Sequence, residues 1–290
     1  MIKVENLSKK FPNGKGIFDI NFQVSKGEVF GFIGPNGAGK STTIRHLMGF
    51  LKPDSGQAKI HGLSCWSEAK DIKKYVGYLP GEIVFPSSMT AREFIKLQEE
   101  LKEIRRNSRS KELIDRFELN VNVPIKKMSK GMKQKLAIVS TFMSDPEVII
   151  LDEPSTGLDP IMQRNLIDVF REEKEKGKTI FLSSHIFEEI ETVADTICIV
   201  KNGKIVEYEK YDDVKKMIKP ILTVTLSDVS NLNNLRVPYT VLGENRIQFE
   251  VDNNADLIIK ELSGYQVIDL DVKKVSLTDV FEKYYKGDQL

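Results

Sequence analysis

Residues 34–42 read Gly34-Pro35-Asn36-Gly37-Ala38-Gly39-Lys40-Ser41-Thr42, and this stretch decides the fold. It matches the pattern G-x-x-x-x-G-K-[ST], which is typical of a phosphate-binding loop. The run at 28–33 predicts a buried strand before it, and residues 43–51 carry apolar side chains at helical spacing after it. Because strand, glycine loop and helix are the setting that the motif requires, the sequence predicts a phosphate site here.

The residue types in this loop suit a polyphosphate. Glycines let successive backbone N–H groups turn inward on phosphate oxygens, and the N-terminus of the following helix adds positive potential. Lys40 can reach the β- and γ-phosphates, and Ser41 can ligate Mg²⁺. A glycine-rich turn that matches the pattern by chance is the alternative, and the flanking strand and helix weigh against it.

The composition narrows the class of protein. Among 290 residues, 43 Lys+Arg stand against 42 Asp+Glu, so bulk charge gives no support for a nucleic-acid partner and none is expected. No apolar run approaches the length of a bilayer span, and the first residues do not resemble a secretion signal. We therefore expect a soluble, cytoplasmic protein. Cys65 and Cys198 lie far apart without a partner motif and are interpreted as reduced, buried thiols.

The second strong signal is an apolar run at 148–151 that ends in Asp152-Glu153-Pro154. A carboxylate at the end of such a strand, downstream of a phosphate loop, is the expected Mg²⁺ ligand, which gives that role to Asp152. Adjacent strand residues point to opposite sides, so Glu153 is displaced toward the attacking water and can act on it as a general base. Two solvated acids at a strand end are the alternative, and the glycine loop weighs against them.

Three further positions have both a functional and an ordinary structural interpretation. Phe11 follows the first strand and either stacks on a purine or packs into the core. Ser129 opens a helix and is at the least its cap, although its hydroxyl and the nearby N–H groups can also bind an anion. His185 follows the strand at 179–182, where open α/β sheets place ligand contacts. It is either structural or contacts a γ-phosphate and holds Glu153 and the water in line.

Taken in order, these motifs resemble the ATP-binding subunits of ABC transporters over residues 1 to about 215. The glycine loop is followed by a helical insertion, a Ser-containing turn, the Asp-Glu strand end, the loop at 155–159 and a lone His. The resemblance implies ATP and Mg²⁺ as cofactors, Lys40, Glu153 and His185 as catalytic residues, and Ser41 and Asp152 as metal ligands. It implies nucleotide-binding roles for Phe11, Gly34, Pro35, Asn36, Gly37, Ala38, Gly39, Lys40, Ser41, Thr42, Ser129 and Gly131.

The resemblance also implies a mode of action. Such cassettes act as head-to-tail pairs, with two ATP molecules between the phosphate loop of one and the signature of the other, here Met128-Ser129-Lys130-Gly131-Met132. Hydrolysis loosens the pair, and this two-state switch drives a separate transmembrane permease subunit. A chain of this kind lies on the inner face of the cell membrane through its permease. The second cassette is a copy of the chain or a paralogue, and the sequence leaves this open.

Two positions depart from the family pattern. The last residue of the signature, usually Gln, is Met132. The glutamine that usually helps to ligate Mg²⁺ and couples the site to the transmembrane subunit is replaced by Gly81. Glu82 or a water molecule is the candidate substitute. These departures bear on the rate of hydrolysis and on coupling, and not on nucleotide binding.

The expected fold is α/β, a P-loop NTPase cassette over residues 1–215 with a RecA-like core sheet. Residues 1–33 predict a small antiparallel sheet beside the nucleotide site. Residues from about 87 to 143 predict a helical subdomain that begins with a capping box at Thr90 and Glu93. Its first amphipathic helix is expected to continue through Leu101 and Ile104. A basic cluster is interpreted as a solvated face, with an acidic partner as the alternative: Lys102, Arg105, Arg106, Arg109 and Lys111.

Residues 216–290 predict a separate small α+β accessory domain. Alternating residues at 222–226 and 247–251 predict strands, 255–262 a helix, 265–272 another strand and 276–285 a terminal helix. This part resembles the C-terminal extension of ABC-2-type exporters and contains no catalytic constellation. A role in dimer contact or regulation is a hypothesis.

The leading hypothesis is the ATP-hydrolysing subunit of a membrane exporter. One rival is a soluble ABC ATPase in a non-transport assembly. The single phosphate loop weighs against the ribosome-acting type, and the short distance in sequence from Lys40 to Ser129 weighs against the DNA-repair type. A second rival is a regulatory module that binds ATP and hydrolyses it weakly. Gly81 and Met132 favour this rival, whereas Glu153 and His185 weigh against it.

Overall fold

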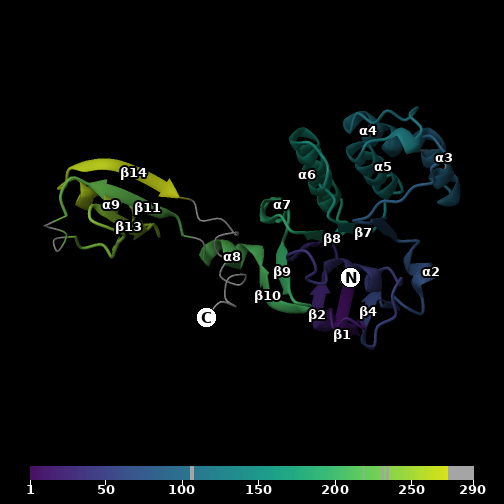
Figure 1. Cartoon of the computed structure of the whole chain (residues 1–290), viewed down its shortest axis with the longest axis horizontal. Coiled ribbons are helices and arrows are strands. Elements are labelled where there is room, and N and C mark those ends of the chain that lie inside the picture. The colour runs from purple at the N-terminus through teal and green to yellow at the C-terminus, as the bar shows by residue number, and fades with distance from the viewer. Residues whose placement is uncertain (105–107, 218, 230–231, 233–234, 274–290) are drawn as a thin grey trace. The chain divides into compact units, whose positions relative to one another are not determined.

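The computed structural model describes residues 1–104, 108–217, 219–229, 232 and 235–273 (Figure 1). The chain divides into two compact units, Met1–Tyr211 and Asp212–Leu290. The division falls a few residues before the boundary near 216 that the sequence pattern suggests.

A six-stranded sheet forms the centre of the first unit, in the order β10-β9-β3-β8-β7-β6. Its strands are β3 (Val29–Ile33), β6 (Val76–Leu79), β7 (Val148–Asp152), β8 (Thr179–Ser184), β9 (Thr196–Lys201) and β10 (Lys204–Lys210). All pair in parallel except β10, which forms an antiparallel hairpin with β9. Because parallel strands end at the same edge, the segments that follow β3, β7 and β8 meet there.

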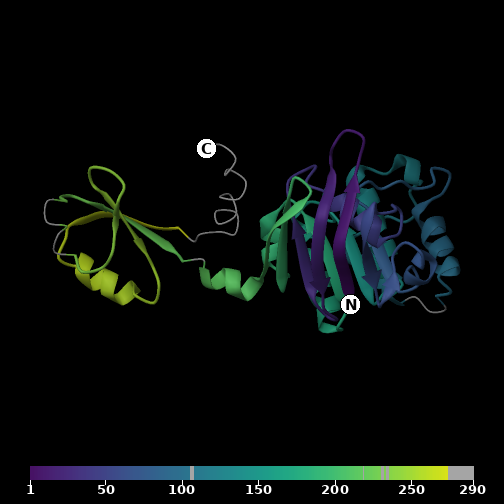
Figure 2. The same cartoon turned by 90° about the horizontal axis from the view of Figure 1, so that it is seen from below.

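A four-stranded antiparallel sheet covers one face of this core, as the sequence predicts, in the order β2-β1-β4-β5. Its strands are β1 (Ile2–Lys10), β2 (Gly16–Val24), β4 (Ser55–Ile60) and β5 (Leu63–Ser64). Strands β1 and β2 are the purple ribbons in Figure 2. An aromatic cluster joins the two sheets, because Phe22 of β2 stacks on Phe30 of β3 at 5.1 Å and lies 5.7 Å from Phe181 of β8. The predicted α/β class is therefore confirmed.

Helices connect the strands of the first unit. They are α1 (Lys40–Leu47), α2 (Ala69–Ile72), α6 (Pro160–Glu175) and α7 (Phe187–Glu191). Helix α1 ends four residues before the helical pattern at 43–51 does, because Gly49 has φ +67° and turns the chain away. Cys65 and Cys198 are both buried and free, in agreement with the interpretation of the sequence.

The helical subdomain comprises α3 (Ala91–Leu101), α4 (Ser108–Arg116), the 3₁₀ turn η1 (Ile125–Lys127) and α5 (Lys130–Phe142). The capping box is confirmed: Glu93 N donates to Thr90 Oγ1 at 3.3 Å, and Thr90 N donates to the Glu93 carboxylate at 2.8 Å. The apolar face predicted for α3 is wrong at the C-terminal end of the helix. Leu101 is 69% exposed, and Ile104 lies beyond the helix, because Glu103 with φ 54° ends the helical path.

The basic cluster of this subdomain is only partly a solvated face. Arg105 and Arg106 lie outside the described residues, and Lys111 is exposed. Arg109, however, donates to Glu112 at 2.5 Å and to Glu173 of α6 at 2.6 Å. The interpretation as a solvated face is therefore wrong for Arg109, because its guanidinium pairs with a carboxylate from a helix distant in sequence.

Arg109→Ala should destabilise the first unit by about 1–3 kcal/mol, the cost of leaving a buried charged group with a missing partner. The side chain of Glu173 is 2% exposed, and among the described residues the variant leaves it one paired cation, Lys176, whose Nζ lies 2.9 Å away. Thermal unfolding measures the loss, with Lys111→Ala as the control on the same helix. Equal melting temperatures for the two variants would contradict a stabilising role for the Arg109–Glu173 pair.

The second unit has its own sheet, in the order β12-β13-β11-β14. Its elements are β11 (Ile221–Leu226), β12 (Thr240–Val241), β13 (Arg246–Glu250), α9 (Ala255–Leu262) and β14 (Val267–Lys273). Ile258 and Leu262 of α9 pack in a core with buried residues of β11 and β13. The predicted helix at 276–285 lies outside the described residues. Helix α8 (Tyr211–Met217) precedes this sheet in sequence.

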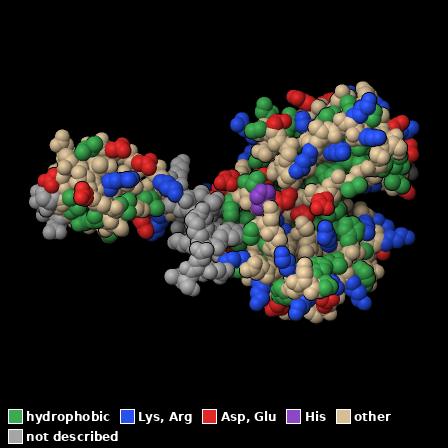
Figure 3. Space-filling view, in the orientation of Figure 1, with side chains coloured by type: hydrophobic (Ala, Val, Ile, Leu, Met, Phe, Trp, Pro, Cys, Tyr) green, Lys and Arg blue, Asp and Glu red, His purple; other side chains and the backbone are tan. Residues whose placement is uncertain are grey.

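The charges on the surface and the length of the helices bear on the class of protein. In the view of Figure 3, acidic and basic side chains are interspersed over the surface of the first unit. Within the described ranges, no helix combines the length and the apolar character that crossing a bilayer requires.

Candidate active site

The phosphate loop follows β3 and leads directly into α1. Gly37 and Gly39 have φ +82° and +110°, values that only glycine adopts without strain. A side chain at Gly39 would also come within 2.7 Å of Ile17. No side chain caps α1, and its first turn contains no acidic residue. The N-terminal N–H groups of this helix are therefore open to an anion.

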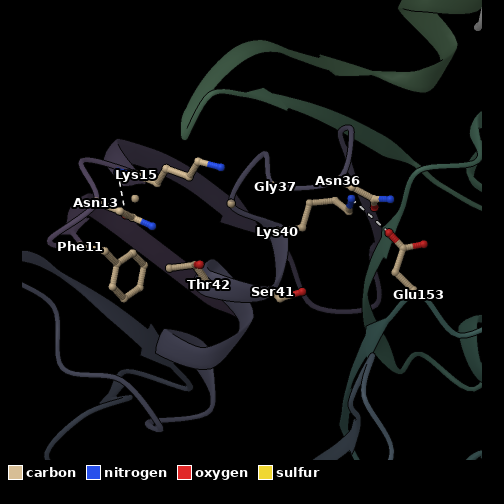
Figure 4. Close-up of a pocket in the computed structure, with 11 residues that line it drawn as sticks. Phe11, Asn13, Lys15, Asn36, Gly37, Lys40, Ser41, Thr42 and Glu153 are labelled. Atoms are coloured by element: carbon tan, nitrogen blue, oxygen red, sulfur yellow. Dashed lines mark hydrogen bonds and ion pairs between the residues drawn. The ribbon is translucent and has the colours of Figure 1, made fainter.

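A cavity of about 300 Å³ lies over this loop (Figure 4). Phe11 lies at one end of it and Glu153 at the other. Of the two interpretations of Phe11, its position at the cavity agrees with stacking, since its side chain is only partly buried. The lining residues are Phe11, Asn13, Lys15, Gly16, Asn36, Gly37, Gly39, Lys40, Ser41, Thr42 and Glu153. Gly34, Pro35 and Ala38 also belong to the phosphate loop, but they do not line the cavity.

Three charged or ionisable side chains form a continuous chain at the end of the cavity. Lys40 Nζ lies 3.1 Å from Glu153 Oε1, and His185 Nδ1 lies 2.6 Å from Glu153 Oε2. Lys40 Nζ also donates to the Gly34 carbonyl oxygen at 2.6 Å. The side chains of Lys40 and Glu153 are 6% and 18% exposed, so the charges attract one another in a site that water screens poorly. The structure thus brings together the three residues with predicted catalytic roles.

The backbone at Glu153 is strained. Its φ is +51°, in the left-handed region that side chains with a Cβ seldom adopt. Glu153 N donates to the Ser183 carbonyl at 3.1 Å, so β7 stays paired with β8 up to the point where the chain turns at Glu153. This turn directs the carboxylate into the cavity, and strain of this kind tends to occur at functional sites.

Asp152 lies at the end of β7 and is 3% exposed. Ser183 Oγ donates to Asp152 Oδ1 at 2.5 Å, from the position opposite it in the parallel register of β8. A Cβ added at Gly81 would lie 3.1 Å from Oδ2, so the glycine leaves that oxygen open on one side. A carboxylate and the Ser41 hydroxyl are hard oxygen donors of the kind that Mg²⁺ prefers. The donor set therefore fits Mg²⁺.

Ser129 and Gly131 do not line the cavity. Ser129 caps α5, with its Oγ accepting from Met132 N at 3.2 Å, so its interpretation as a helix cap is confirmed. A Cβ at Gly131 would come within 2.8 Å of the Gly157 carbonyl oxygen, which means that the start of α5 packs closely on the loop after Glu153. Ser129 is exposed, so its hydroxyl remains accessible to a group from outside.

The sequence interpretation missed several residues of the site. Asn13 and Lys15 line the cavity beside Phe11, and no motif distinguishes them. Gln134 donates to the Pro154 carbonyl at 2.6 Å and so ties α5 to the segment that carries Glu153. Ser183 could have been found, because pairing β7 with β8 in parallel register sets it opposite Asp152.

Comparisons with known proteins agree on one family. A family model described as ABC transporter matches residues 17–156. The chain is 37% identical over 233 residues to the bacitracin transport ATP-binding protein BcrA of Bacillus licheniformis, which covers 79% of this chain and 76% of that protein. It is 29% identical over 294 residues to the Nod factor export ATP-binding protein I of Rhizobium etli. This match covers 97% of this chain and 92% of that protein. A solved ATP-binding subunit of an ABC transporter matches with a TM-score of 0.69 and 31% identity, over 75% of this chain and 92% of that one.

Proposed function

The chain belongs to the ATP-binding proteins of ABC transporters and is an ATPase, and on that premise we propose that it drives a membrane exporter as one of two Mg²⁺-dependent cassettes. The observation that carries the catalytic part of this proposal is the Lys40–Glu153–His185 chain at the end of the cavity. Each of its members has a role that follows from its contacts.

The nucleotide lies along the cavity in this proposal. Phe11 stacks on the adenine, and the backbone N–H groups of residues 34–42, with the first turn of α1, surround the phosphates. Lys40 exchanges the Gly34 carbonyl for oxygens of the β- and γ-phosphates, which are stronger partners for an ammonium group.

Ser41 and Asp152 would hold Mg²⁺, and the cation would supply positive charge against the phosphates. Ser183 orients Asp152 through Oδ1 and leaves Oδ2 for the cation. Gly81 has no side chain that could ligate the cation, so Glu82 or a water molecule would take that place.

Glu153 accepts the proton of the attacking water. His185 contacts its carboxylate through Nδ1, which leaves Nε2 for an oxygen of the γ-phosphate. His185 thus holds the base in line and stabilises charge on the transferring group.

Ser129 and Gly131 contact the ATP of a second cassette. Both lie outside the cavity of their own chain, and Ser129 is exposed at the N-terminus of α5. A head-to-tail pair lets this N-terminus cover the γ-phosphate that the partner's loop holds. The pair closes on ATP and opens after hydrolysis.

The membrane partner is a separate permease subunit, which keeps the chain on the inner face of the cell membrane. Support comes from relatives whose names state bacitracin transport and Nod factor export. Residues 216–290 are then an accessory α+β domain attached to the cassette formed by residues 1–215.

The test is purification of the tagged chain from its native membranes in detergent. We expect a multi-span membrane protein to co-purify in stoichiometric amount. It should dissociate when a mutation disrupts the contact between the chain and this membrane protein. A chain that hydrolyses ATP at full rate and is recovered without any membrane protein would contradict the exporter and favour a soluble assembly.

A further inference from the structure

Helix α7 begins two residues after His185 and carries a carboxyl group that the steps above do not use. This is Glu189, whose Oε2 accepts a hydrogen bond from Ser184 Oγ at 2.9 Å. Its Oε1 is buried and accepts no hydrogen bond from the described part of the chain. A buried carboxyl with one unsatisfied oxygen is costly, so its presence beside the catalytic pair needs a reason.

Glu189 is hydrogen-bonded to the segment that carries His185, and the charge of Glu153 acts on it. Ser184 is the residue before His185. Burial raises the pKa of Glu189, the hydrogen bond from Ser184 opposes this, and the charge on Glu153 raises it further. Ser184 is itself 0% exposed, so the hydroxyl that donates to Glu189 lies inside the protein.

The catalytic pair needs such support. The backbone of Glu153 is strained, with φ +51°. His185 lies in the short connection between β8 and α7. Neither side chain is inside a regular element that would fix it. Their 2.6 Å contact therefore depends on what holds the two segments together.

We propose that Glu189 is a positioning residue for ATP hydrolysis, which holds the His185 segment in place through Ser184. This inference rests on the proposed function, because it requires Glu153 as the base. Glu189 does not touch the nucleotide in this account. It acts by keeping the imidazole and the carboxylate of the pair in contact.

The test compares Glu189→Ala and Glu189→Gln with Glu188→Gln, a control at an exposed position on the same helix. Glu189→Ala should lower kcat about tenfold, as expected for loss of a positioning contact, while the KM for ATP changes less than about twofold. Glu189→Gln should retain kcat within about threefold, because the amide has the same shape and still accepts from Ser184 Oγ.

A double-mutant cycle and an NMR signal separate positioning from general stability. In a His185→Ala background, Glu189→Ala should have little further effect on kcat, since its action passes through the histidine. The ¹⁵N signal of His185 Nδ1 should shift in Glu189→Ala and stay in place in Glu188→Gln. Multiplicative effects in the cycle, or an unmoved ¹⁵N signal, would overturn the proposal.

Failure of this inference can be told from failure of the proposed function. If Glu153→Gln abolishes hydrolysis and Glu189→Ala has wild-type kcat, only the positioning role is overturned. If Glu153→Gln hydrolyses ATP normally, the base is wrongly assigned and both fall. Should Glu189→Ala not fold, Glu189→Gln combined with Ser184→Ala removes the same hydrogen bond, and an unchanged kcat and ¹⁵N signal would then overturn the role.

Discussion

Glu153→Gln should stop phosphate release and leave ATP binding intact. The amide keeps the size of the side chain and can still contact His185 and Lys40, but it cannot accept the proton of the attacking water. General-base catalysis contributes about 10²–10⁴-fold, so kcat should fall by that factor. Because ATP then persists in the site, the variant should also change from monomer to dimer on adding ATP, which light scattering measures as a doubled mass.

Glu147→Gln is the matched control for this prediction. Glu147 precedes β7 and Glu153 follows it, so the two substitutions alter opposite ends of one strand. The side chain of Glu147 is 53% exposed, and His61 Nε2 lies 3.5 Å from its carboxylate. Its variant should hydrolyse ATP at the wild-type rate. Steady phosphate release from Glu153→Gln, at a rate close to that of Glu147→Gln, would be incompatible with Glu153 as the base.

The central residues of the site could be predicted from the sequence, because the order of strands and helices along the chain determines where they lie. A glycine loop must turn between β3 and α1, so Lys40 and Ser41 have to lie at the start of that helix. Asp152 and Glu153 end β7, and parallel strands end at one edge, which brings His185 of the β8 segment to Glu153. These arguments need only the types of element and the direction of the strands.

The missed contacts depend on where elements distant in sequence pack. Glu189 reaches Ser184 only because the chain folds back between β8 and α7, and no motif predicts that bond. Arg109 was interpreted as solvated since its own helix shows a charged face, whereas its partner Glu173 lies 64 residues away on α6. No spacing rule within one helix contains that information.

The predicted ends of two helices were wrong for a different reason. The apolar pattern of α3 continues to Ile104, but Glu103 adopts φ 54° and ends the helix at Leu101. Periodicity reports which side chains suit a helix, while a single left-handed residue decides where it stops. The same applies to Gly49 after α1, with φ +67°.

Lys40→Met should weaken ATP binding by about 10–100-fold. Methionine resembles the buried stem of lysine but lacks the ammonium group. A hydrogen bond to a charged group contributes about 1.5–3 kcal/mol, and each 1.4 kcal/mol corresponds to about tenfold in affinity. The variant also loses the donors to the Gly34 carbonyl and to Glu153, but neither contact involves the nucleotide. Calorimetric titration with a non-hydrolysable ATP analogue measures the affinity directly.

The comparison with Glu153→Gln makes this second prediction specific. Both substitutions break the same 3.1 Å ion pair, yet one should reduce affinity and the other should reduce only kcat. Lys70→Met, at an exposed position of α2, controls for the loss of one positive charge from the chain and should bind as the wild type does. If Lys40→Met binds the analogue as tightly as Lys70→Met, then Lys40 does not hold the phosphates. Its contact with Glu153 would then be a structural ion pair, and the phosphate site would rest on the backbone N–H groups of the loop alone.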